Sequence, residues 1–140
     1  MIVADTGGIL ALLNRDDEHH ERVAALFRAR QRECVLPWAI LPEVDYMAST
    51  RLGRHVATAF CQDVAEGLFR VDWSGSRDAS RASELIARYA DLEIGLVDAV
   101  VMAQAERHRA TTIVTTDARH FRAVHLELPS PPALVPLDPA

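Results

Sequence analysis

Asp98 is a charged residue in a stretch that otherwise has the composition of a core helix. Residues 95–106 read GLVDAVVMAQAE, and at helical spacing Asp98 shares a face with Val101 and Met102. A carboxylate on that face would be partly buried. Because burial of an unpaired charge is costly, we expect Asp98 to face a cation, which is either an arginine such as Arg119 or a metal ion.

Three further carboxylates stand where predicted strands give way to helices. Asp5 ends an apolar run at the N-terminus, and Asp117 follows the β-branched run TTIVTT. Glu43 lies in the first turn of a helix predicted to begin near Pro42. Taken singly, Asp5 or Asp117 could be a helix cap, and Glu43 could be a first-turn acid favoured by the helix dipole.

Considered together, the four acids indicate a cation site. If the strands are parallel, all four carboxylates reach the same edge of the sheet. The chain has no lysine to pair with them, and like charges at one edge raise each other's pKa and destabilise the fold. Oxygen ligands without Cys or His suit Mg²⁺ or Mn²⁺. Such a site supports phosphodiester hydrolysis, because the ion polarises a phosphoryl oxygen and lowers the pKa of a bound water.

The elements that must position these acids alternate between strands and helices. Strands are predicted in the segments MIVADT, ECVLP, LFRVDW, TTIVTT and ALVPL, with helical patterns between them. Gly7 and Gly8 predict a flexible turn before the short helix ILALLN. This alternation favours an α/β protein with a parallel sheet and helices on both faces.

Length and composition fit one domain over residues 1–140, with a proline-rich, extended C-terminal segment at 129–140. We expect no signal peptide and no membrane span, and a cytoplasmic location with reduced cysteines. The net charge of −5 argues against a broad nucleic-acid-binding surface. It does not exclude a nucleic acid held at a local site.

Four pieces of the sequence, in this order, resemble a PIN-domain ribonuclease, specifically the VapC-type toxins of VapBC toxin–antitoxin pairs. The pieces are VADT, PEV, LVDAVVMAQAE and IVTTDARHF. The resemblance implies a three-layer α/β/α fold with a central parallel sheet and metal-dependent endoribonuclease activity. It places the acidic quartet of the family on Asp5, Glu43, Asp98 and Asp117.

The resemblance also implies supporting residues and partners. Thr6 would orient Asp5 or contact a metal-bound water, and Thr115 would hold the loop or a phosphate. A homodimer and an inhibitory cognate antitoxin are implied as well. The chain departs from the family where a pair such as Ser-Ala is replaced by Gly7 and Gly8, which predicts a more flexible loop.

Basic residues directly after Asp117 are candidates for RNA binding. Arg119, His120 and Arg122 could hold an RNA phosphate beside the metal site, or they could simply form a solvated turn.

The sequence therefore predicts a Mg²⁺- or Mn²⁺-dependent endoribonuclease toxin that cleaves single-stranded loops of a structured RNA, either tRNA or rRNA. One alternative is a non-catalytic PIN-fold module that acts in a regulatory complex. Another is a phosphatase of the haloacid-dehalogenase type. That type would need a second aspartate where this chain has Gly7, and a lysine that the chain lacks.

Overall fold

A five-stranded parallel sheet forms the centre of the computed structural model, which describes all 140 residues. The strand order is β3-β2-β1-β4-β5, and every neighbouring pair is parallel. The carboxyl ends of all strands therefore share one edge, as the alternating pattern predicts. The strands are β1 (Ile2–Ala4), β2 (Cys34–Pro37), β3 (Val71–Asp72), β4 (Thr112–Thr115) and β5 (Ala133–Pro136).

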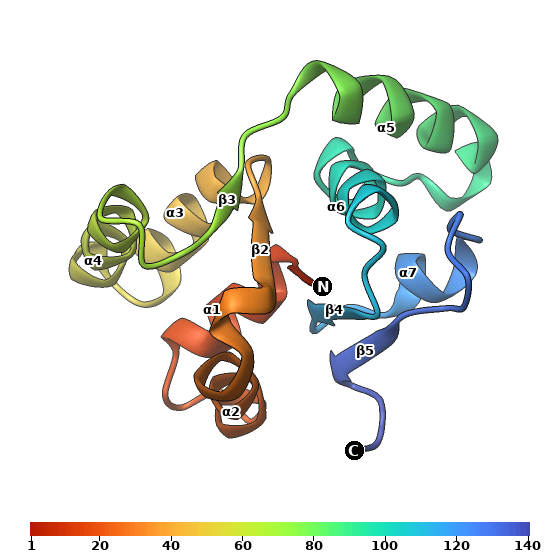
Figure 1. The fold of residues 1–140 in the computed structure, drawn as a ribbon. Helices are drawn as coiled ribbons and strands as arrows, with labels where there is room; N and C mark the ends of the chain where they lie inside the picture. Colours follow the sequence, from red (N-terminus) through yellow and green to blue (C-terminus); the bar gives the residue numbers. More distant parts are fainter.

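Helices lie on both sides of this sheet, so the predicted three-layer α/β/α architecture is confirmed. Figure 1 shows α1 to α4 on one side and α5 to α7 on the other. The seven α-helices are α1 (Thr6–Leu13), α2 (His20–Arg30), α3 (Ile40–Arg51), α4 (Arg54–Ala65), α5 (Ser76–Arg88), α6 (Leu96–Arg107) and α7 (Arg119–Ala123).

The chain changes direction across the sheet between β1 and β4. From β1 it proceeds outward to β2 and β3, and it then returns to the other side of β1 to form β4 and β5. In open parallel sheets, ligands bind beyond the carboxyl ends of the strands at such a reversal. Asp5 directly follows β1, and Asp117 lies two residues after the end of β4.

Helix α1 begins at Thr6 and includes both Gly7 and Gly8, so the predicted flexible turn is wrong. The reason is close packing of α1 on β4. A Cβ atom on Gly8 would lie 2.5 Å from the carbonyl oxygen of Val114, and one on Gly7 would collide with Oγ1 of Thr116. The glycines therefore permit a close approach of backbones rather than a mobile loop.

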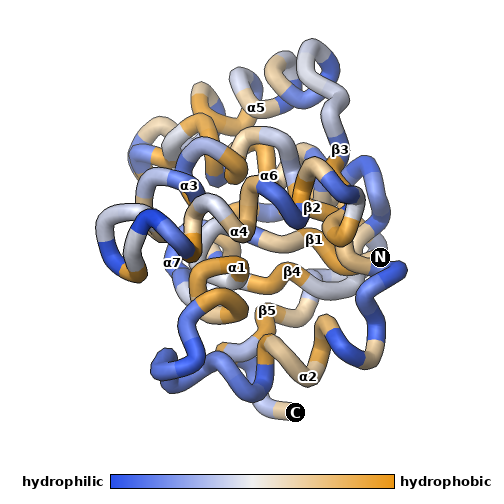
Figure 2. Tube along the Cα trace, turned by 90° about the vertical axis from the view of Figure 1, so that its left-hand side faces the viewer, coloured by the Kyte–Doolittle hydropathy of each residue, from blue (hydrophilic) through white to orange (hydrophobic).

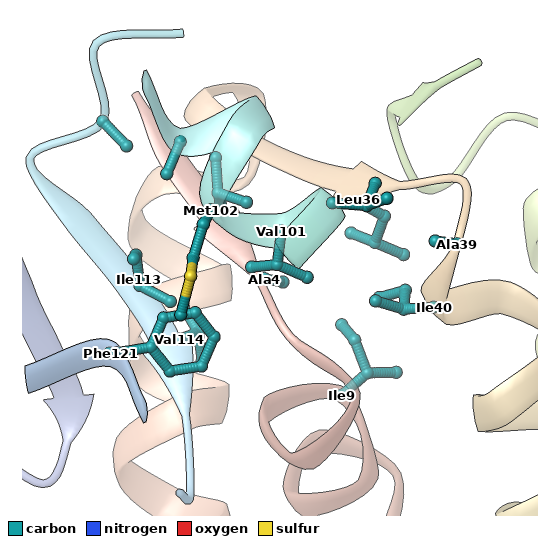
Figure 3. Packing of buried hydrophobic residues seen from close by; sticks show 14 of the residues in the cluster. Ala4, Ile9, Leu36, Ala39, Ile40, Val101, Met102, Ile113, Val114 and Phe121 are labelled. Atoms are coloured by element: carbon teal, nitrogen blue, oxygen red, sulfur yellow. The ribbon is translucent and has the colours of Figure 1, made fainter. Parts of the chain in front are cut away.

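The core lies between the sheet and the helices. Figure 3 shows Val101 and Met102 of α6 in a cluster with Ala4, Ile113 and residues of neighbouring elements, and all of these side chains are buried. Figure 2 shows the hydrophobic colour concentrated on α1 and the central strands, and the hydrophilic colour on outlying segments. None of the helices has the length and apolar character to cross a membrane.

Candidate metal centre

The structure brings the four predicted acids together around one pocket of about 280 Å³. Asp5 follows β1 and caps α1, whereas Asp117 follows β4. Glu43 and Asp98 lie in the first turns of α3 and α6. Each carboxylate thus comes from a different segment. The predicted start of α3 near Pro42 is two residues late, because the helix begins at Ile40.

Asp5 is the most deeply enclosed of the four acids, with 6% of its surface exposed. Its Oδ1 accepts a hydrogen bond from the backbone N of Thr6 (2.8 Å), and its Oδ2 accepts one from Oγ1 of Thr115 (2.9 Å). Burial and the nearby negative charge of Asp98 raise the pKa of Asp5 to about 7, against the lowering effect of these two hydrogen bonds. The charge of Glu43 raises it further.

Thr115 joins the first acid to the last. Besides donating to Asp5, its fully buried hydroxyl accepts a hydrogen bond from the backbone N of Asp117 (3.1 Å). The family resemblance implies that Thr115 holds either the loop or a phosphate, and these contacts fit the first of the two roles.

Asp98 has a partner within the chain, and it is not the arginine that the sequence suggests. Its Oδ2 lies 2.9 Å from Nδ1 of His120. Arg119 instead uses its backbone N to donate to Oδ1 of Asp117 (3.0 Å), and its side chain does not line the pocket. Arg122 points elsewhere and pairs with Asp138 (2.6 Å). Of the three basic candidates, only His120 contacts one of the four acids through its side chain.

Arg51 is a pocket residue that the sequence analysis missed. It is the only basic residue among those that line the pocket, and its side chain is exposed. Glu43, Met47 and Arg51 are spaced four residues apart along α3, so they share one face of that helix. The four-residue spacing along α3 was the sequence signal that could have identified Arg51 as a pocket residue. Asp17 also lines the pocket and was likewise not singled out.

The chemistry of the pocket fits a hard divalent cation, although no three His, Cys, Asp or Glu side chains form a preformed ligand group. The acids supply oxygen ligands only, which is what Mg²⁺ and Mn²⁺ prefer. Burial, together with the negative charges of Asp98 and Glu43, raises the pKa of Asp5, and a bound cation would relieve the repulsion between these acids. The hydroxyl of Thr6, which also lines the pocket, is buried without a hydrogen-bond partner.

Comparison with known proteins assigns the chain a family. The family model described as "PIN domain" matches residues 2–126. Ribonuclease VapC26 of Mycobacterium tuberculosis is 28% identical over 123 residues, a stretch that covers 88% of this chain and 91% of the relative.

Solved structures share the fold at lower identity. VapC20 of Mycobacterium tuberculosis, described as a sarcin–ricin loop cleaving toxin, has a TM-score of 0.79 at 22% identity and covers 91% of this chain and 98% of its own. DNA-bound VapBC from Salmonella typhimurium has a TM-score of 0.69 at 17% identity, with 95% of each chain covered. FitAcB from Neisseria gonorrhoeae has a TM-score of 0.66 at 19% identity and covers 94% of this chain and 98% of that one.

Proposed function

Because the chain belongs to the PIN-domain family, we propose that it is a Mg²⁺- or Mn²⁺-dependent endoribonuclease toxin of the VapC type. The observation that carries this proposal is the convergence of four carboxylates from four segments on one pocket. The relatives support RNA as the substrate, since one is named a ribonuclease and another a sarcin–ricin loop cleaving toxin. We therefore propose a structured RNA, such as a tRNA or rRNA loop, as the substrate.

In this proposal Asp5, Glu43, Asp98 and Asp117 hold the metal ion, directly or through water. When bound, the ion supplies a Lewis acid that polarises the scissile phosphate and lowers the pKa of the attacking water. Thr115 keeps the carboxylate of Asp5 turned toward the loop of Asp117 through its two hydrogen bonds.

Other residues of the pocket would bind or orient the substrate. The hydroxyl of Thr6 is free to donate to an oxygen atom in the pocket, because it has no partner within the chain. The guanidinium of Arg51 would bind an RNA phosphate, since it supplies the positive charge that the acids lack.

Cleavage of a structured RNA by the purified protein tests the proposal. We expect cleavage with Mn²⁺ or Mg²⁺, none with excess chelator, and none with Asp98→Asn. A matched control is Asp91→Asn, an exposed acid before α6 that does not line the pocket. Cleavage that persists in Asp98→Asn would contradict the proposal. Binding without cleavage in the parent protein would favour the non-catalytic module.

The phosphatase alternative lacks the residues that it needs. It requires an acid at position 7, where this chain has a glycine, and a lysine, which the chain does not contain.

We also propose a cognate antitoxin and a homodimer as protein partners. The VapBC and FitAcB assemblies among the structural neighbours support an antitoxin. An apolar groove that contains Trp38, Phe60 and Trp73 supports a protein partner of some kind, because Trp73 is left 67% exposed within it. Light scattering of the purified chain tests the dimer. Inhibition of RNA cleavage by the product of an adjacent small gene tests the antitoxin.

A further inference from the structure

We propose that His120 is a positioning residue that sets the orientation of the Asp98 carboxylate toward a bound divalent cation. The inference rests on the proposed function, because it concerns the same pocket. Its basis is the contact between Nδ1 of His120 and Oδ2 of Asp98 at 2.9 Å, which joins α7 to the first turn of α6.

The charged form of Asp98, which is the form that binds a cation, determines which atom donates. An ionised carboxylate can only accept hydrogen bonds, so Nδ1 of His120 carries the hydrogen. The two side chains are 13% and 29% exposed for His120 and Asp98, respectively. A hydrogen bond to a charged acceptor in such a partly enclosed place is stronger than one in open water. The imidazole is thus well suited to hold one rotamer of Asp98.

The hydrogen bond leaves one oxygen of Asp98 for a ligand in the pocket. Oδ2 accepts from His120, and Oδ1 has no hydrogen-bond partner within the chain. Oδ1 would therefore be available to a cation in the pocket without competition from another hydrogen bond. Carboxylates that bind metals are commonly oriented by such outer partners, and the loss of the partner weakens metal affinity.

The same contact adds a second attachment between the segment around Asp117 and the other acids. Thr115 joins Asp5 to the backbone of Asp117. His120 follows Asp117 by three residues and joins that segment to Asp98. The segment from Thr115 to His120 is therefore held at one end by Asp5 and at the other end by Asp98.

This role is separate from the RNA contact that the sequence suggests for His120, which stays a prediction. A basic side chain that binds a phosphate must present a free donor, and in His120 only Nε2 is left for that purpose. The Nδ1 donor of His120 is already directed at Asp98, and most of the ring is covered.

Mn²⁺ binding by two variants of His120 tests the proposal. Asn places an amide near the position of Nδ1 and can still donate to Asp98, whereas Leu is of similar size and cannot. We expect His120→Leu to weaken Mn²⁺ affinity by about tenfold or more, and His120→Asn by less than about threefold. Free Mn²⁺ would be counted by electron paramagnetic resonance, with the Tm in chelator as a check on folding.

A third comparison shows whether the effect passes through Asp98. In an Asp98→Asn background, His120→Leu should change Mn²⁺ affinity by less than about twofold, because coupled residues are non-additive. Equal Mn²⁺ affinity in the parent and His120→Leu would overturn the proposal, as would equal losses in the Leu and Asn variants. A parent protein that binds Mn²⁺ but cleaves no RNA would contradict the proposed function and leave the role of His120 standing.

Discussion

The side chain of Thr115 connects Asp5 with Asp117 through a single hydroxyl group. Oγ1 donates to Oδ2 of Asp5 over 2.9 Å and accepts from the backbone N of Asp117 over 3.1 Å. The two acids follow adjacent strands, and the register of β1 on β4 aligns Ala4 with Val114. The separation of the first and last acids is therefore fixed by the sheet itself, and the pocket inherits the rigidity of its central strand pair.

Asp5→Asn should make the metal-free protein more stable at neutral pH. Burial raises the pKa of Asp5 to about 7 from an ordinary value of 3.8, so ionisation of this carboxyl favours the unfolded chain. The destabilisation is absent below pH 4 and grows as the pH rises toward 7. At about 1.4 kcal/mol per pKa unit, this shift corresponds to at most about 4 kcal/mol at pH 7.5 in chelator, and weaker hydrogen bonds from Thr6 and Thr115 to the amide reduce the net gain.

Urea unfolding of the parent and of Asp5→Asn at pH 4.5 and pH 7.5 measures this difference. The two curves should lie close together at the lower pH and separate at the higher one. Added Mn²⁺ should raise the Tm of the parent and leave that of Asp5→Asn unchanged. A variant that is less stable than the parent at both pH values would contradict the electrostatic account.

Glu43→Gln should reduce RNA cleavage by roughly 100-fold, which corresponds to about 2.7 kcal/mol in the activation barrier. The matched control is Asp45→Asn, because Asp45 lies two residues from Glu43 on the same helix but does not line the pocket of the four acids. The measurement is kcat/KM for a structured RNA at saturating Mn²⁺. Similar activity in the two variants would remove Glu43 from the site.

Arg51→Ala should weaken RNA binding without weakening Mn²⁺ affinity, because Arg51 supplies positive charge to the pocket and no metal ligand. We expect the salt dependence of RNA affinity, log Kd against log salt, to fall in slope by about 1. Binding would be measured in an Asp98→Asn background to prevent cleavage. Arg54→Ala, an exposed arginine that begins the next helix, should leave the slope unchanged. Equal slopes for the two variants would contradict this role.

Arg107→Met should destabilise the fold by about 3 kcal/mol, because it leaves the carboxylate of Asp78 buried without its cation. Arg107 contacts Asp72 at 2.8 Å and Asp78 at 2.9 Å, and Asp78 is 1% exposed. Burial opposes ionisation of Asp72, but hydrogen bonds from Arg107, Ser74 and His108 outweigh it and hold the pKa of Asp72 well below its usual range.

The pH dependence of that loss has a definite sign. Because the pKa of Asp72 is lower in the folded protein than in the unfolded chain, ionised Asp72 stabilises the fold above about pH 4. This stabilisation is lost as the pH falls below that value. The difference in Tm between the parent and Arg107→Met should therefore be full at pH 7 and should narrow below pH 4. A difference that widens in acid would show that another group dominates.

Gly8→Ala should destabilise the protein by about 1–3 kcal/mol, as is usual when a methyl group is forced into a packed interface. The added Cβ would meet the carbonyl of Val114 at 2.5 Å, so α1 would have to move away from β4. Gly75→Ala, which has no atom within 4 Å of its new Cβ, is the control. Thermal unfolding distinguishes the two, and equal Tm values would indicate that α1 shifts without strain.

The sheet and the meeting of the acids could be predicted because they follow from local signals. Apolar and β-branched runs mark the strands, and the carboxyl-end rule places Asp5 and Asp117 on one edge without any knowledge of side-chain contacts. The roles of Gly7 and Gly8 could not be predicted in this way. A glycine pair is typical of both turns and close helix packing, and only the position of Val114 distinguishes the two.

The direction in which each basic side chain points could likewise not be predicted from the sequence. Arg119, His120 and Arg122 are close in sequence, but the short helix α7 turns them toward different surroundings. Arg51 was overlooked because it lies two helical turns beyond Glu43. Its spacing from Glu43 is informative only once α3 is known to point that face at the pocket.

The hydrogen bond between Thr115 and Asp5 spans 110 residues of sequence. The pocket therefore cannot assemble on a partly synthesised chain, since β4 must emerge from the ribosome before Thr115 can reach Asp5. A chain in mid-translation carries the first acids but lacks the last. For a protein proposed to cut RNA, this order delays any nuclease activity until β4 has been synthesised, and a product that ends before β4 lacks both Thr115 and Asp117.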